Sequence, residues 1–121
     1  MSDAHALNGA LEGVDRLVNR GGEADDVLRA IVRTLSERIG YSYVGIAFVE
    51  GDRLELGPAE GSPGGGALAF PIAFEGRRVG ELRVEPPPEG DEERAFLERV
   101  ATLIAPYCLV GWDTGGKRWE P

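Results

Sequence analysis

Apolar residues near the start of the chain recur at steps of three and four, which is the spacing of one helical stripe. The first stripe comprises Leu7, Leu11, Val14 and Val18. After a break at Gly21 and Gly22, a wider stripe comprises Val27, Leu28, Ile31, Val32, Leu35 and Ile39. Asp25 and Asp26 suit the positive end of this second helix, and Gly40 suits a left-handed cap at its end. The pattern therefore predicts two helices before position 41.

From Tyr41 the apolar pattern changes to a period of two, which is typical of β-strands. Four strands are expected, over residues 41–49, 53–57, 67–74 and 79–85. Tight turns at Gly51–Asp52 and Glu75–Gly76 join them into two hairpins, and the glycine run 64–66 lies in a loop between the hairpins. Pro71 has no N–H to donate to a ladder, so we expect the third strand at an edge of the sheet.

A third helix is predicted after the run Pro86 to Pro88, which stops the last strand. Its apolar face comprises Phe96, Leu97, Val100, Leu103, Ile104 and Tyr107. Acidic side chains from Asp91 onwards suit its start, and Pro106 is expected to kink or shorten it. Two helices, four antiparallel strands and a third helix predict an α+β fold, with the helices packed on one face of the sheet.

The two faces of this sheet differ in character. The face expected against the helices is apolar and comprises Val44, Ile46, Phe48, Leu54, Leu56, Leu68, Phe70, Ile72, Phe74, Leu82 and Val84. The opposite face is expected to be mixed, small and polar, and comprises Tyr41, Tyr43, Ala47, Glu55, Ala69, Ala73, Glu81 and Arg83. In the last strand, Val79 and Glu85 are also expected to face outward. Antiparallel sheets often leave one face to water, so a purely solvated surface also fits this composition.

Length and charge narrow the classes of function. The 121 residues suit one domain, which we divide into an N-terminal helix (1–22), a core (23–110) and a tail rich in Gly and Trp (111–121). The formal net charge of −8 repels phosphate backbones and anionic lipid, so we expect no nucleic-acid and no membrane partner. One Cys and one His cannot form a zinc cage, so no metal and no cofactor is expected, and the lone Cys fits a reducing cytoplasm.

Several segments together resemble the GAF domain, nearest the branch that contains the free methionine-(R)-sulfoxide reductases. They are residues 43–48, 54–58, 70–72, 79–82 and 91–100, together with Gly61, Pro63 and Gly76. The resemblance covers roughly 24–106 and implies a strand order of 2-1-4-3. It also implies a sensory or regulatory module that binds a small molecule and dimerises through its helices, although a minority of such domains are enzymes.

The chain departs from that branch where catalytic cysteines and a pocket-covering segment are expected. Here Pro63 is followed by three glycines and then directly by a strand. The signature of cyclic-nucleotide GAF domains is missing, as are a bilin cysteine and a haem histidine in the middle of the domain. The sequence therefore resembles a minimal GAF domain.

Cys108, the only thiol, is expected near the C-terminal end of the last helix. The helix dipole disfavours a thiolate there, so we expect a buried small hydrophobe rather than a nucleophile. Sulfoxide reduction also needs a second thiol, or an external one, to resolve its intermediate. An enzyme is therefore the disfavoured interpretation.

Two sets of candidate functional residues remain. The candidate ligand-binding set comprises Tyr41, Tyr43, Glu55, Glu81 and Arg83. Arg83 would bind an anionic group of the ligand, and a tyrosine would stack on it. The candidate interface or lid set comprises Leu7, Leu11, Val14, Trp112 and Trp119. The tryptophans are expected over the same sheet face or in a neighbouring subunit. Equally open is that Trp112 caps the last helix and Trp119 is disordered. The first helix is expected either in a dimer bundle or within its own chain.

Together these features favour a non-catalytic, cytoplasmic sensory or regulatory module that binds a small molecule or a protein partner, as a homodimer. A dimerisation or scaffold module without ligand is one alternative. An enzyme of the methionine sulfoxide reductase type is the other, and the single cysteine counts against it.

Overall fold

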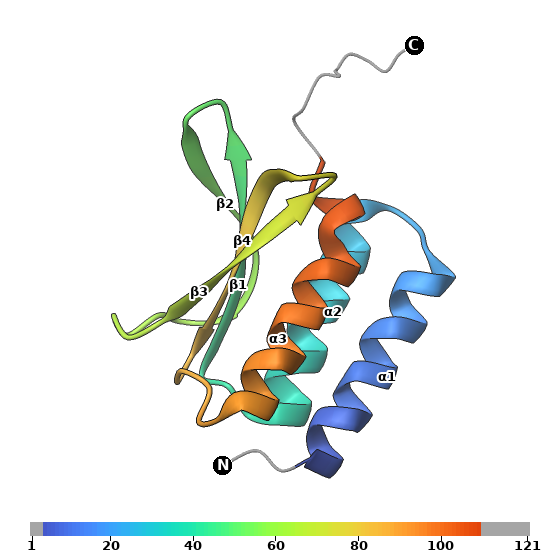
Figure 1. The fold of residues 1–121 in the computed structure, drawn as a ribbon, viewed down its shortest axis with the longest axis vertical. Coiled ribbons are helices and arrows are strands. Elements are labelled where there is room, and N and C mark those ends of the chain that lie inside the picture. Colours follow the sequence, from blue (N-terminus) through green and yellow to red (C-terminus); the bar gives the residue numbers. More distant parts are fainter. Residues whose placement is uncertain (1–3, 110–121) are drawn as a thin grey trace.

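Residues 4–109 are described by the structure, a computed structural model, and they form three α-helices, a short 3-10 helix and four strands (Figure 1). The helices are α1 (Ala4–Arg20), α2 (Ala24–Ile39), α3 (Asp91–Ile104) and the 3-10 helix η1 (Ala105–Cys108). The strands are β1 (Tyr43–Glu50), β2 (Arg53–Gly61), β3 (Leu68–Phe74) and β4 (Arg77–Glu85). They form one antiparallel sheet in the order β2-β1-β4-β3. The predicted α+β class and strand order are confirmed.

All three α-helices lie on one side of the sheet, and α1 lies farthest from it (Figure 1). α2 and α3 cover the sheet directly, and α1 packs across both of them. Their shared core includes Leu28, Leu82 and Leu97, whose side chains are inaccessible to solvent. The sheet therefore has an inner face against α2 and α3, and an outer face that no described helix covers.

The ends of the helices follow the sequence signals. Gly40 ends α2 with a φ of 96°, a left-handed conformation that favours glycine, and its N–H donates to the Ser36 carbonyl at 3.0 Å. α3 ends at Ile104, and Pro106 lies in the 3-10 turn that follows. Within residues 4–109 no helix is both long enough and apolar enough to cross a membrane.

The register of β2 overturns one expectation from the sequence. The turn at Gly51–Asp52 pairs Val49 with Leu54 and Ala47 with Leu56. Residues that pair across a ladder lie on the same face of a sheet, so both leucines lie on the outer face with Val49 and Ala47. Leu54 is 41% exposed and Leu56 is 76% exposed, so their assignment to the core was wrong.

A second correction concerns Val79. The register between β3 and β4 shifts between Ile72 and Ala73, so β4 has an extra residue at this point. Val79 was expected on the outer face, but it turns inward at this bulge and is buried in the core. β2 also continues to Gly61, through part of the expected loop, because its pairing with β1 resumes beyond another irregularity.

Candidate functional site on the outer face of the sheet

A charged ridge runs along β4 on the outer face and comprises Arg78, Glu81 and Arg83. The Nε of Arg83 donates to Oε1 of Glu81 at 3.0 Å, and the guanidinium of Arg78 donates to Oε2. Both carboxylate oxygens of Glu81 are therefore paired, while each guanidinium has five N–H donors. Two cations around one anion leave a surplus of positive charge, which suits the recognition of a further carboxylate or phosphate.

Small side chains flank the ridge on both sides. The residues that pair with Glu81 and Arg83 in the neighbouring strands are Gly45, Ala47, Ala69 and Pro71. Arg78 is the more exposed of the two cations, with 53% of its side chain accessible, against 28% for Arg83. Both guanidinium groups of the ridge are therefore at least partly accessible to a partner.

Tyr43 closes one end of this surface. Its side chain folds back over Gly45 and is buried. A Cβ at Gly45 would lie 2.7 Å from the Cζ of Tyr43, closer than real carbon atoms approach, so this position of the ring requires glycine. Tyr43, Glu81 and Arg83 are the members of the predicted ligand-binding set that the structure brings to one face.

Glu55 lies on the other face of the sheet. It pairs with Phe48, whose side chain packs against the core, and its carboxylate forms an ion pair with Arg53. The expectation that Glu55 shares a face with Glu81 was therefore wrong. The cause is the same register that turns the neighbouring leucines outward.

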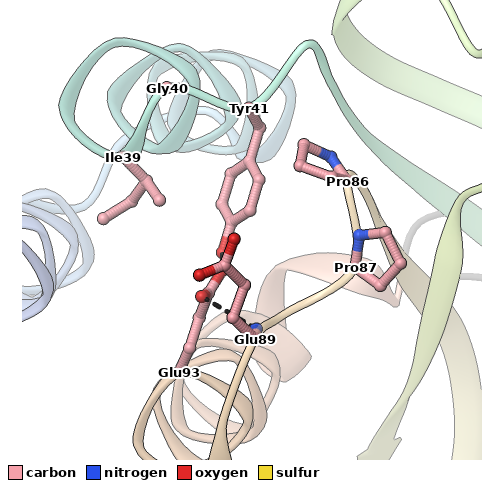
Figure 2. Close-up of a pocket in the computed structure, with 7 residues that line it drawn as sticks. All are labelled: Ile39, Gly40, Tyr41, Pro86, Pro87, Glu89 and Glu93. Atoms are coloured by element: carbon pink, nitrogen blue, oxygen red, sulfur yellow. Dashed lines mark hydrogen bonds between the residues drawn. The ribbon is translucent and has the colours of Figure 1, made fainter. Parts of the chain in front are cut away.

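Tyr41 also lies away from the ridge, on the helix side of the molecule (Figure 2). It precedes β1, and its hydroxyl donates a 2.6 Å hydrogen bond to Oε2 of Glu93 in the first turn of α3. The other oxygen of Glu93 accepts a 3.2 Å hydrogen bond from the backbone N–H of Glu89. Burial, and then the hydrogen bond to Glu93, raise the pKa of Tyr41 well above its usual range. Tyr41 thus joins the end of α2 to the start of α3.

Four hollows lie away from the ridge. The hollow beside Tyr41 and Glu93 measures about 50 Å³, which suits a water molecule rather than an organic ligand (Figure 2). Hollows of about 240 and 220 Å³ lie between α1 and α3, and another of about 220 Å³ lies at the β3–β4 turn. Typical ligand pockets measure about 300–1,000 Å³. None of these four hollows is lined by Tyr43, Glu81 or Arg83.

Cys108 is fully buried at the end of η1. Burial raises its pKa to about 12, so the thiol is protonated at neutral pH. The prediction of a buried small hydrophobe is confirmed. Within residues 4–109, no group of three or more His, Cys, Asp or Glu side chains is placed to hold a metal ion.

The candidate interface residues divide into three cases. Leu7 and Val14 are buried within their own chain. Leu11 is partly exposed and lines both hollows between α1 and α3. Trp112 and Trp119 lie outside the described residues.

The glycine loop between β2 and β3 binds an anion that belongs to the same chain. The N–H of Gly64 donates to Oε1 of Glu85 at 2.6 Å, and the N–H of Gly66 donates to the other carboxylate oxygen. This contact pins the loop to the end of β4, where Glu85 pairs with Tyr43. The sequence offered a glycine run as a signal but not its carboxylate, because the two are brought together by the fold.

Comparisons with known proteins identify the fold. No family model and no curated protein matches the sequence. The GAF domain of an Acinetobacter phosphoenolpyruvate-protein phosphotransferase superposes with a TM-score of 0.77 at 13% identity, over 98% of this chain and 100% of that one. The free methionine-R-sulfoxide reductase of Neisseria meningitidis, in complex with its substrate, superposes with a TM-score of 0.73 at 16% identity, over 94% of this chain and 96% of that one. The type II free methionine-R-sulfoxide reductase of Thermoplasma acidophilum superposes with a TM-score of 0.64 at 17% identity, over 77% of this chain and 95% of that one.

These likenesses confirm that the chain has the GAF fold, as the resemblance in the sequence implied. The similar structures include both a domain of a phosphotransferase and sulfoxide reductases, so the same fold occurs in proteins of different activity. With identities of 13–17%, the comparisons establish the fold and leave the function to the chain's own residues.

Proposed function

We propose that this chain is a non-catalytic regulatory module of the GAF type, acting in the cytoplasm, that binds an acidic segment of a partner protein on the charged ridge. The supporting observation is the pairing of Arg78 and Arg83 around Glu81 on a face that no described helix covers. Guanidinium groups bind carboxylates and phosphates through charge-assisted hydrogen bonds. In a chain with a net charge of −8, the ridge is a local positive site.

A protein partner is favoured over a small molecule because the ridge lines none of the four hollows described above. Small-molecule sites bury most of their ligand in a concave pocket, whereas protein interfaces are wide and shallow. The hollows described above lie away from the ridge. A small molecule remains the alternative ligand, and native mass spectrometry of the purified protein tests it, because a retained ligand adds its own mass.

The partner is tested by comparing the proteins retained by three immobilised chains: the wild type, Arg83→Ala, and Arg94→Ala as an exposed control on α3. We expect at least one protein that the wild type and Arg94→Ala retain and that Arg83→Ala loses, with binding that weakens as salt is raised. An identical set of proteins on all three chains excludes the ridge as the binding site.

Thiol-based sulfoxide reduction is disfavoured by the setting of Cys108. A nucleophilic cysteine is accessible and has a lowered pKa, whereas this one is buried and its pKa is raised to about 12. The wild type and Cys108→Ser are therefore both expected to show only background turnover of free methionine sulfoxide. Turnover by the wild type that this variant loses would establish the enzyme interpretation.

We also propose that the chain forms a homodimer through α1 and α3. Such a dimer is equally compatible with the alternative of a scaffold module that binds no ligand. The supporting observation is the pair of hollows along these helices, which share Leu11 and Arg99 and continue to Leu103. Leu11→Glu is expected to convert a dimer to a monomer in native mass spectrometry, because it places a charge in the apolar contact. A monomeric wild type contradicts the proposal.

A further inference from the structure

An apolar patch lies on β2, on the outer face of the sheet. This leucine patch comprises Leu54 and Leu56, whose exposed fractions are 41% and 76%. They are the large apolar side chains that are exposed among the described residues. They share one face because they lie two positions apart on a strand. Exposed apolar side chains that gather at one place are typical of a contact site, and the binding of an acidic segment by the ridge alone gives this patch no role.

The leucine patch and the charged ridge belong to one surface. Across the sheet, Leu56 of β2 pairs with Ala47 of β1, and Ala47 pairs with Glu81 of β4. These three residues lie on the same face because paired positions of a ladder do. Ala47 is buried, so no gap open to solvent separates the leucine from the ridge at this position. A partner that reaches the ridge therefore has the leucine patch two strand spacings away, or about 10 Å.

The different chemistry of the patch and the ridge specifies the partner. The ridge carries two guanidinium groups around one carboxylate, and this surplus of positive charge complements carboxylates. The leucine patch complements apolar side chains, which leave water when they pack against it. An extended segment along β1 directs the side chains of one face straight at the sheet, so it contacts only the row beneath it. An α-helix with its side chains is about 10–12 Å wide, which matches the separation of the patch and the ridge.

We infer that the partner's acidic segment is an amphipathic helix that lies along β1 on the outer face, with its apolar stripe on the leucine patch and its carboxylates on the charged ridge. The inference rests on the proposed function, because it names the kind of segment that the ridge binds. Such a helix has apolar side chains at steps of three and four residues, and Asp or Glu along one side of this stripe. It covers the outer face as α2 and α3 cover the inner one.

A display library of random peptides of about 16 residues, long enough for several helical turns, tests this inference on the immobilised full-length chain. We expect the retained peptides to share the apolar and acidic spacing described above. Fluorescence anisotropy then gives the dissociation constant of one synthesised peptide for the wild type and for variants. Leu56→Ser and Arg83→Ala are each expected to weaken binding about tenfold or more, because each removes a direct contact. Leu56 is largely exposed, so its replacement leaves the fold intact.

Two control variants keep the wild-type affinity: Leu56→Met, which preserves the apolar volume, and Arg94→Ala, which removes an exposed charge from α3. Circular dichroism of the mixture, compared with that of its separate components, is expected to show added helix.

The possible failures of this test have different meanings. An empty library, retained peptides without the helical spacing, or binding without added helix overturns the inference. Affinity that survives Leu56→Ser but is lost in Arg83→Ala also overturns it, and leaves the proposed binding by the ridge standing. Affinity that survives Arg83→Ala overturns the inference and the proposed function together.

Discussion

The inner and outer faces of the sheet carry leucines that differ in their exposure to solvent. Leu82 on the inner face is inaccessible to solvent, whereas Leu56 on the outer face is 76% exposed. The inner face is covered by α2 and α3, and the outer face by none of the described helices. Burial of apolar area contributes about 25 cal/mol per Å², so the inner face provides most of the folding stability. The exposed positions of the outer face, such as Leu56, contribute less to folding stability and can serve binding.

The largest expected effect separates these two leucines. Leu82→Ala is expected to lower the free energy of unfolding by about 2–5 kcal/mol, because it leaves a cavity in the packed core. Leu56→Ala changes it by less than about 0.5 kcal/mol, as is usual for exposed positions. Urea unfolding followed by circular dichroism measures both. Similar losses for the two variants would break the distinction between the faces.

The exposed leucines also show what a sequence can and cannot predict. A two-residue turn at Gly51–Asp52 places Val49 opposite Leu54, so counting the ladder from the turn puts the leucines outside. Hydrophobicity alone points the other way and gave the wrong face for Leu54, Leu56 and Glu55. Register was the stronger signal, and it was present in the sequence.

Other features of the structure could not be predicted from the sequence, because they depend on contacts between separate elements. The bulge that turns Val79 inward depends on how β3 and β4 twist together. The contact of Tyr41 with Glu93 joins residues 52 positions apart, and it requires the docking of α3. By contrast, the end of α2 at Gly40 and the end of α3 before Pro106 were predictable, because each depends on the chemistry of one residue.

The buried pair Tyr41–Glu93, on the helix side of the sheet, gives the next largest expected change in the free energy of unfolding. Tyr41→Phe is expected to cost about 1–3 kcal/mol, because it removes a donor from a buried carboxylate. Tyr107→Phe is the control: its hydroxyl donates to the Val18 carbonyl at 2.9 Å in a half-buried site, so its loss costs about 0.5–1.5 kcal/mol. Urea unfolding ranks the two. Equal losses would show that the charge of Glu93 adds nothing to the contact.

The buried thiol gives the inner side a pH dependence. The pKa of Cys108 is raised by burial from 9.0 to about 12, so between these values the folded state keeps a proton that the unfolded state loses. The unfolded state then binds fewer protons, and stability falls as pH rises, by at most about 1.4 kcal/mol per pH unit. Below the lower value this contribution is fully present.

Cys108→Ala isolates this dependence from the titration of other groups. The advantage of the wild type over the variant is expected to shrink as the pH is raised from about 8 to about 10. Unfolding in urea at both pH values gives the difference. A constant difference between the two proteins would mean that the thiol ionises as readily in the folded protein as in the unfolded chain.

The smallest expected effect lies on the outer face. Arg78 is 53% exposed, and Glu81 keeps Arg83 when Arg78 is removed. Arg78→Ala is therefore expected to cost no more than about 1 kcal/mol, and less as salt is raised. A double-mutant cycle with Glu81→Gln isolates the coupling of the pair. A coupling above about 2 kcal/mol, which exceeds the range of exposed ion pairs, would mean that the ridge stabilises the fold. A small coupling leaves the guanidinium groups of the ridge available to a partner, as the proposed function requires.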